Sequence, residues 1–364
     1  MSIGKKIVIL HRAHWEQVMG GAELQISYLV NELIRRGYEV HYIYEDNGKC
    51  IENKVAIHLH PLKKFNIRKW FGEILFLYRK SIIECLKKIR PDIIYTRCYS
   101  SWSGFAGLYA HDNNIKHIWA IASDYDLRPL KRYTPLKILN CLENYFALKS
   151  FKYASYILTQ NDFQQKRLRT MYNRQGIKIL PVSPGVDKSK LIKGENVVVL
   201  WIANLKPVKR PELFIALASN FRNSDSIRFT MIGRSGKKYA DVIYKVQQNQ
   251  QNFRYRGEIS NDEVDKNLCT AHLLVNTSEV EGFSNTFVQA WMHKVIVLSM
   301  KSNPDNVITK YGIGFICPTI DELIRKIELL INNEELREKM AEKAYQYAIN
   351  NHTLNNLNKI FSLL

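Results

Sequence analysis

The sequence predicts an α/β protein made of two Rossmann-like, doubly wound domains that face each other across a cleft. Short apolar runs typical of buried strands alternate with helical patterns, and this alternation starts a second time near residue 196. Such alternation indicates a parallel sheet covered by helices on both faces. Between the two series, residues 180–196 (LPVSPGVDKSKLIKGEN) are rich in Pro, Gly and Lys, as expected of an inter-domain linker.

The first series begins close to the N-terminus. Residues 5–10 form an apolar run with β-branched side chains, and residues 22–37 carry apolar residues at helical spacing up to Gly37, where we expect the helix to end. We expect further strands at 38–45, 91–97, 115–123 and 153–161, and a helix at 103–114.

The second series repeats this arrangement. Strand-like runs occur at 196–204, 227–233, 271–278, 295–300 and 312–317, and helical patterns at 211–221 and 262–271. We therefore expect an N-terminal domain over residues 1–185 and a C-terminal domain over 186–345. The last helix, within 346–364, is expected to return to the N-terminal domain.

Composition narrows the class of protein. The chain has 364 residues, of which 46% are hydrophobic, and its six cysteines are scattered without a C-x-x-C pair. This pattern favours a reduced, cytoplasmic protein without a zinc knuckle or a disulfide framework. The apolar core of the N-terminus, Ile7–Leu10, is shorter than the roughly 7–15 residues of a secretory signal. No run approaches the ~18 apolar residues of a membrane span.

Net charge is the one extreme value, at +19. Residues 1–190 hold 31 Lys and Arg against 16 Asp and Glu, a surplus of 15, and the remainder holds 22 against 18, a surplus of 4. A basic N-terminal half implies an anionic partner, which is a nucleic acid, an acidic membrane surface or a phosphorylated substrate.

Two glycines stand between the first predicted strand and the first predicted helix. In Gly20-Gly21-Ala22-Glu23 they would let the backbone approach a ligand, and the helix N-terminus would offer N–H groups to a phosphate. A tight turn without a ligand explains the same residues. The G-x-G-x-x-G fingerprint of dinucleotide-binding proteins is absent, which argues against the hypothesis of a nicotinamide dehydrogenase.

A cationic loop follows the first strand of the second series. It runs from Asn204 through Lys206, Lys209 and Arg210 and leads into a helix that begins near Pro211. Cations beside a helix N-terminus suit a diphosphate, although a solvated loop has the same composition.

A carboxylate and an amide frame a later helix start. Glu281 and Gln289 are eight residues apart; we expect Glu281 in a loop and Gln289 inside the helix, where it could bind sugar hydroxyls. The backbone N–H groups of Gly282, Phe283, Ser284 and Asn285 could hold phosphate oxygens. A helix cap followed by an exposed amide is the competing interpretation.

These stretches, in this order, resemble the GT-B glycosyltransferases of the family-4 type. The family's E-x7-E motif is similar to Glu281-GFSNTFV-Gln289, its G-R-L…K loop to Ala203-Asn204-Leu205…Lys209, and its G-G-x-E to residues 20–23. RFTMIGRSG, FRYRGEIS and SNPDNVI extend the resemblance over most of the chain.

The resemblance implies transfer of a sugar from a nucleoside diphosphate donor, with retention at the anomeric carbon and without a bound metal or other cofactor. Lys209 would balance the diphosphate, assisted by Arg210, and Gln289 would contact the ribose. Glu281 would touch the transferred sugar. Gly21, with Gly20 beside it, would let the first domain close over the phosphates.

The sequence departs from the family pattern at three positions. Asn204 stands where the family usually has arginine, so Lys206 or Arg210 would have to supply that charge. Gln289 replaces the second glutamate but still accepts a hydrogen bond. Asp124, in WAIASDYD, follows a strand where the family often has histidine, and it would act on the substrates or cap the next element. The alternative that the protein is a homologue with reduced or no activity therefore stays open.

Residues 61–90 are strongly basic, with nine Lys and Arg against Glu73 and Glu84. Trp70, Ile74, Leu77 and others recur at helical intervals. This pattern indicates a helix with a solvated basic face, or a surface that binds anionic lipid on the inner face of the plasma membrane, where each cation adds ~1 kcal/mol.

The leading hypothesis is a glycosyltransferase with a glycan or lipid-linked acceptor, in cell-surface polysaccharide or lipopolysaccharide synthesis. A basic nucleic-acid-binding protein has the right charge but lacks any recognition motif, so no nucleic acid is expected. A sugar-nucleotide epimerase of the same fold is the third alternative. We expect no metal site, because no H-x-x-x-H or D-x-D cluster occurs.

Overall fold

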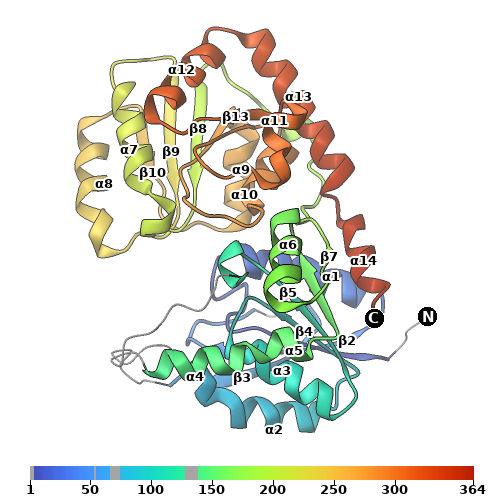
Figure 1. Ribbon diagram of the computed structural model, residues 1–364. Coiled ribbons are helices and arrows are strands. Elements are labelled where there is room, and N and C mark those ends of the chain that lie inside the picture. Colours follow the sequence, from blue (N-terminus) through green and yellow to red (C-terminus); the bar gives the residue numbers. More distant parts are fainter. Residues whose placement is uncertain (1–3, 53–54, 66–73, 128–137) are drawn as a thin grey trace. The chain divides into compact units, whose positions relative to one another are not determined.

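The structure is a computed structural model that describes residues 4–52, 55–65, 74–127 and 138–364 (Figure 1). The chain divides into two compact units. Unit 1 comprises residues 1–180 and 357–364, and unit 2 comprises residues 181–356.

Unit 1 is built on a seven-stranded sheet with the order β3-β2-β1-β4-β5-β6-β7. Every neighbouring pair is parallel. The strands are β1 (Lys6–Leu10), β2 (Glu39–Asp46), β3 (His58–Lys63), β4 (Ile93–Arg97), β5 (Lys116–Ala120), β6 (Tyr156–Thr159) and β7 (Ile177–Lys178).

Helices connect these strands and cover the sheet. They are α1 (Gly21–Arg35), α2 (Arg79–Ile89), α3 (Ser101–Asp112), α4 (Ile138–Ala147), α5 (Lys149–Tyr153) and α6 (Asp162–Tyr172), with the short η2 (Leu75–Tyr78) and η3 (Asp124–Leu127). α2 and α3 pack on one face, where Ile82, Phe105 and Ala106 join Val8 and Ile43 of the sheet in one buried cluster.

Unit 2 contains a six-stranded sheet with the order β10-β9-β8-β11-β12-β13, again parallel throughout. The strands are β8 (Val197–Ile202), β9 (Ile227–Ile232), β10 (Phe253–Tyr255), β11 (Leu273–Asn276), β12 (Ile296–Ser299) and β13 (Gly314–Ile316). In both units the chain winds from a central strand to one edge and then to the other. The predicted α/β class with two Rossmann-like domains is confirmed.

Unit 2 helices follow the same pattern. They are α7 (Pro211–Asn220), α8 (Lys237–Asn249), α9 (Asn261–Thr270), α10 (Asn285–Met292), α11 (Val307–Tyr311), α12 (Ile320–Ile331) and α13 (Glu334–Asn351), with η5 (Lys188–Lys190), η6 (Pro207–Lys209), η7 (Pro304–Asn306) and η8 (Leu354–Leu357). α7, α8 and α12 contribute Phe214, Ile243 and Leu323 to a buried cluster with β8 and β9.

The C-terminal residues belong to unit 1. In α14 (Asn358–Phe361), Phe361 lies under the guanidinium of Arg36 at 3.7 Å, and Asn358 accepts a hydrogen bond from Arg36 at 2.5 Å. Lys116 donates to the backbone oxygen of Leu363 at 3.1 Å. Of the range 346–364, the residues up to 356 stay in unit 2, because α13 packs against α10 and α12 there.

The unit boundary lies between Leu180 and Pro181, inside the Pro-rich segment and five residues before the expected boundary at 185/186. The strands β3, β7 and β10 and the helices α4, α5, α6, α8 and α11 were not predicted. Of these, β7, β10, α5 and α11 have five residues or fewer, too few to set a period.

The prediction of a single helix over residues 61–90 was wrong. Its first residues, up to Lys63, complete β3, and only residues 79–89 form the helix α2. Trp70 and Glu73 lie outside the described residues. α2 buries Ile82, Leu86 and Ile89, whereas Lys80, Lys87 and Lys88 are exposed.

Candidate functional site

The loop after β8 carries the cations predicted to bind phosphate. Lys209 ends η6, and α7 begins at Pro211, a residue suited to the first helical position because it has no N–H to satisfy. Arg210, between them, has a left-handed backbone with φ of 50°. Lys209 and Arg210 therefore lie at the N-terminus of α7, the positive end of its dipole.

A close backbone approach positions the start of this loop. Gly233, after β9, has φ of 142°, and a Cβ added there would lie 1.8 Å from the backbone oxygen of Ala203. A glycine is therefore required at this position. The next residue, Arg234, donates its backbone N–H to Oδ1 of Asn204 at 3.3 Å, and its oxygen accepts from the N–H of Leu205 at 3.0 Å.

Glu281 pairs directly with this cationic loop. Its Oε1 lies 2.5 Å from Nζ of Lys209 and 3.4 Å from Nδ2 of Asn276, the last residue of β11. Only 24% of the Lys209 side chain and 14% of the Glu281 side chain are exposed. Such a pair, largely removed from water, interacts more strongly than a surface ion pair.

Hydrogen bonds from a buried strand hold the pair in place. Thr277, directly after β11, donates to the backbone oxygen of Lys209 at 2.6 Å and accepts from the indole N–H of Trp201 at 2.9 Å. The N–H of Glu279 donates to the oxygen of Val208 at 2.9 Å. The loop after β8 and the loop before α10 are thus fastened together.

The residues from Gly282 to Gln289 form the start of α10. The helix begins at Asn285 with Ser284 as its N-cap, so Gly282 and Phe283 lie in the preceding loop. The Phe283 ring is buried against Trp291 and His352, at 6.2 Å and 5.0 Å between centroids. Gln289 lies in the second turn and is 6% exposed. Glu281 is in a loop and Gln289 in a helix, as expected.

In unit 1 the two glycines begin a helix at the carboxyl edge of the sheet. Gly20 is the N-cap of α1, and Gly21 is its first residue. Glu23, in the first turn, accepts a hydrogen bond at 3.0 Å from Nε2 of His11, which follows β1. Burial raises the pKa of Glu23, but the hydrogen bond and charge of His11, its own backbone N–H and Arg97 outweigh burial and lower that pKa overall.

Asp124 lies at the same edge, after β5, but its contacts are structural. Its Oδ1 accepts from Nε2 of Gln164 at 2.8 Å and from Nδ2 of Asn161 at 3.2 Å, which are the first residues around α6. Asn161 is the N-cap of that helix. The interpretation of Asp124 as an anchor for the next element therefore has direct contacts in its favour.

Sequence reasoning missed two arginines, Arg97 and Arg234. Arg97 ends β4, and its charge lowers the pKa of both Glu23 and Asp126. Burial has the larger effect on Asp126 and raises its pKa. The sequence signal that could have found them is an arginine at the carboxyl end of a buried-strand run. Arg97 ends the run 91–97, and Arg234 directly follows the run 227–233.

The predicted residues lie in both units. In unit 2, Lys209 contacts Glu281, Arg210 follows Lys209, and Asn204, at the start of the same loop, is hydrogen-bonded to Arg234. Unit 1 holds Gly20, Gly21 and Asp124 along the carboxyl edge of its sheet. Among the described helices, none is long and apolar enough to cross a membrane.

Two family models match the chain, "Glycosyl transferases group 1" over residues 185–347 and "Glycosyltransferase Family 4" over residues 19–190. A relative described as an uncharacterized glycosyltransferase of Haemophilus influenzae is 21% identical over a 347-position alignment that covers 89% of this chain and 90% of the relative.

Solved structures share the fold. Anabaena Alr3699/HepE, in complex with UDP and glucose, matches with a TM-score of 0.75 and 15% identity over 98% of both chains. WaaG, a glycosyltransferase involved in lipopolysaccharide biosynthesis, matches with a TM-score of 0.71 and 14% identity over 94% of this chain and 95% of WaaG. At these identities the likeness shows the fold alone.

Proposed function

Because the chain belongs to the GT-B glycosyltransferases of the family-4 type, we propose that it transfers a sugar from a nucleoside diphosphate to a hydroxyl of a glycan or lipid-linked acceptor, with retention. The observation that carries this proposal is the Lys209–Glu281 pair between two helix N-termini. It combines a cation for phosphate with a carboxylate for the sugar.

The donor diphosphate would bind at the N-termini of α7 and α10. Helix N-termini attract anions through their dipoles and N–H groups. Lys209 and Arg210 add two positive charges, and residues 282–285 add the backbone of the α10 start. Protein cations would thus take the place of a metal ion at the diphosphate. Gln289, in the second turn of α10, is assigned to the ribose.

Arg234 offers a replacement for the family arginine that is missing at Asn204. Its backbone is hydrogen-bonded to Asn204, and its side chain is exposed on the adjoining loop. A guanidinium there can reach toward the same phosphates with a bidentate geometry. We assign this role to Arg234 and not to Lys206. Arg234 is hydrogen-bonded to Asn204 itself, whereas Lys206 is an exposed residue two positions further along the loop.

The chemical step breaks the bond between the anomeric carbon and the phosphate oxygen. A bond to the acceptor oxygen forms on the same face of the sugar, and the acceptor proton passes to the departing phosphate. Glu281 would stabilise positive charge that develops on the sugar, since fixed charges in a site shielded from water act strongly. Asp124 would act as a positioning residue that holds the start of α6.

The acceptor is assigned to unit 1, whose carboxyl edge holds Gly20, Gly21 and the buried Glu23–His11 pair. The exposed cations of α2 favour an acceptor at an anionic membrane surface. WaaG acts in lipopolysaccharide biosynthesis, and a cell-surface glycan is the substrate class we propose here.

The test is a thermal-shift screen against UDP-, GDP-, ADP- and CMP-sugars, because a ligand that binds the folded state raises the melting temperature. We expect one nucleotide class to stabilise the wild type and a much smaller shift in Lys209→Ala. Lys301→Ala is the matched control, since Lys301 is an exposed cation that pairs with Glu279 at 3.8 Å. The absence of a shift with every donor would contradict the proposal. An equal shift in Lys209→Ala and Lys301→Ala would contradict it too.

A further inference from the structure

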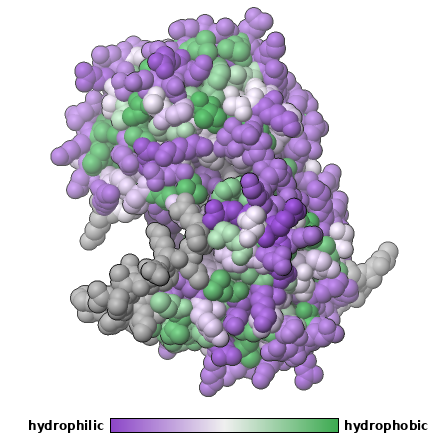
Figure 2. All heavy atoms as spheres, viewed as in Figure 1, coloured by the Kyte–Doolittle hydropathy of each residue, from purple (hydrophilic) through white to green (hydrophobic). Residues whose placement is uncertain are grey.

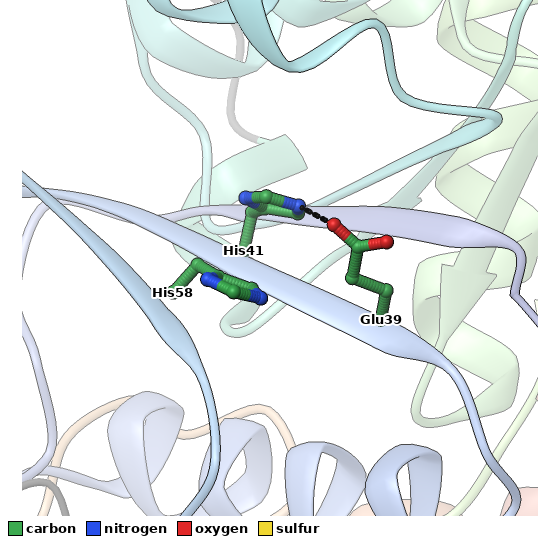
Figure 3. A group of neighbouring side chains, drawn as sticks. All are labelled: Glu39, His41 and His58. Carbon is green, nitrogen blue, oxygen red and sulfur yellow. Dashed lines mark hydrogen bonds and ion pairs between the residues drawn. The ribbon is translucent and has the colours of Figure 1, made fainter.

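Four polar side chains lie on one face of β2 and β3, at the edge of the unit 1 sheet; three of them are drawn in Figure 3. Glu39 and His41 are alternate residues of β2, and His58 and His60 are alternate residues of β3. Alternate residues of a strand point to the same side. In the parallel register, His41 lies opposite His58.

Three of these residues are close enough to share one ion. A single ligand atom from each of Glu39, His41 and His58 lies within 4.8 Å of the other two. In the part of the chain that the structure describes, this is the group with metal-ligand character. The expectation of no metal-ligand cluster overlooked it, because the residues come together only through strand pairing.

The hydrogen bonds of His41 orient it for coordination. Its Nε2 lies 2.9 Å from Oε1 of Glu39, and its Nδ1 lies 2.9 Å from Nε2 of His60. The His41 ring is buried and stacks on His58 with centroids 4.6 Å apart. Metal-bound histidines typically give their other ring N–H to an acceptor such as a carboxylate or a backbone carbonyl, which fixes the ring. Nε2 of His60 can serve as that acceptor for His41.

We propose that Glu39, His41 and His58 form a binding site for a divalent transition metal of the Zn²⁺ type, with His60 as the positioning residue. Two imidazoles and one carboxylate favour Zn²⁺ over Mg²⁺ or Ca²⁺, which prefer oxygen ligands. His41 would bind through Nε2 and donate Nδ1–H to His60. Water would complete the tetrahedron on the exposed side of His58.

The required movement falls on side chains that reach solvent. Tetrahedral Zn²⁺ with bonds of about 2.1 Å keeps its ligand atoms about 3.4 Å apart. Glu39, at 35% side-chain exposure, and the exposed His58 can rotate inward toward His41. Lys6 is the competing cation, with its Nζ 3.7 Å from Oε1 of Glu39, and metal binding would displace it.

The bound metal would fasten the edge strand β3 to β2. Glu39 and His58 are the first residues of their strands, so the site lies at the amino edge of the sheet. Gly20, Gly21 and Asp124 lie at the carboxyl edge. The proposed metal therefore stabilises unit 1 and takes no part in sugar transfer, and the inference stands independently of the proposed function.

The experiment uses the full chain without an affinity tag, treated with chelator and then titrated with Zn²⁺ by calorimetry. We expect one Zn²⁺ per chain and a rise in melting temperature with Zn²⁺ but not with Mg²⁺. His58→Ala should weaken binding at least 10-fold; this exposed residue can be removed without opening the core. His60→Ala should weaken binding roughly 10–100-fold through loss of ring orientation.

His111→Ala is the matched control, because His111 is exposed on the same unit but outside the group. Its Zn²⁺ affinity should equal that of the wild type. If His58→Ala also binds Zn²⁺ like the wild type, the proposal is overturned. A second result would also overturn the proposal. If alkylation of the exposed Cys50 and Cys141 abolishes Zn²⁺ binding, while His58→Ala leaves the Zn²⁺ affinity unchanged, the metal is bound by thiols.

Discussion

At the scale of single residues, the paired charges of Lys209 and Glu281 are the centre of the proposed chemistry. The carboxylate is held by one cation and one amide, and little of it reaches water. A charge in such surroundings is already oriented before substrate binds, which is the arrangement that stabilises a developing charge at low cost. The asparagine at 204 removes a cation from the same loop without disturbing this pair.

Glu281→Gln tests the carboxylate. The amide keeps the size and a hydrogen bond to Asn276 but removes the charge, so we expect turnover to fall by about 10²–10³-fold. Glu279→Gln is the control, since Glu279 is in the same loop with 49% of its side chain exposed. Initial rates with the donor found in the screen provide the measurement. Similar rates for the two variants would remove Glu281 from the mechanism.

At the scale of elements, α2 divides cleanly into a buried and a solvent-exposed face. Ile82, Leu86 and Ile89 enter the core beneath it, whereas Lys80, Lys87 and Lys88 are exposed. In the view of Figure 2, hydrophobic residues appear as separate patches among hydrophilic ones rather than as one continuous surface. The exposed residues of α2 itself are all charged, so any membrane contact made by this helix would depend on charge.

Replacing Lys80, Lys87 and Lys88 together by glutamine should weaken binding to acidic vesicles about 100-fold, because each cation near the surface contributes ~1 kcal/mol. Liposome flotation at low salt measures this. The control replaces three exposed cations of unit 2, Arg325, Lys339 and Lys343, with the same change in net charge. Equal loss in both variants would mean that net charge alone acts; absence of wild-type binding would rule out the membrane surface.

At the scale of the whole molecule, both units bury neutral histidines. Burial lowers the pKa of His117 to about 3, and it lowers the pKa values of His14, His293 and His352 to about 4. In His293 and His352 a backbone hydrogen bond acts in the opposite direction, but burial has the larger effect on the pKa. Folding therefore keeps these rings uncharged under conditions in which an unfolded chain would protonate them.

The sign of the pH dependence follows directly. Between the unfolded pKa near 6.5 and the folded pKa, the unfolded state binds more protons, so stability falls as pH falls. We expect each buried histidine to lower the free energy of unfolding by about 2 kcal/mol between pH 7 and pH 5. Urea midpoints at several pH values measure this. His117→Gln should flatten the profile, and His111→Gln, at an exposed position, should not. An unchanged profile in His117→Gln would contradict the assignment.

Much of the architecture was predictable because its signals are local. The runs KKIVIL, PDIIYTR and NVVVLWIAN are buried on both sides in a parallel sheet, so their composition alone identified β1, β4 and β8. Glycine and helical periodicity fixed α1 in the same way. β3 escaped prediction because it is an edge strand, in which His58, His60 and Lys63 interrupt the apolar pattern.

The sequence by itself determined the fold class, the family and the order of the stretches proposed to bind phosphate, since each depends on residues close together along the chain. Only the tertiary structure decided which distant side chains meet: Lys209 with Glu281, Arg234 with Asn204, and His41 with His58. The physical reason is that these contacts depend on strand order and register, which fix neighbours across a sheet but leave no period or motif in a single sequence.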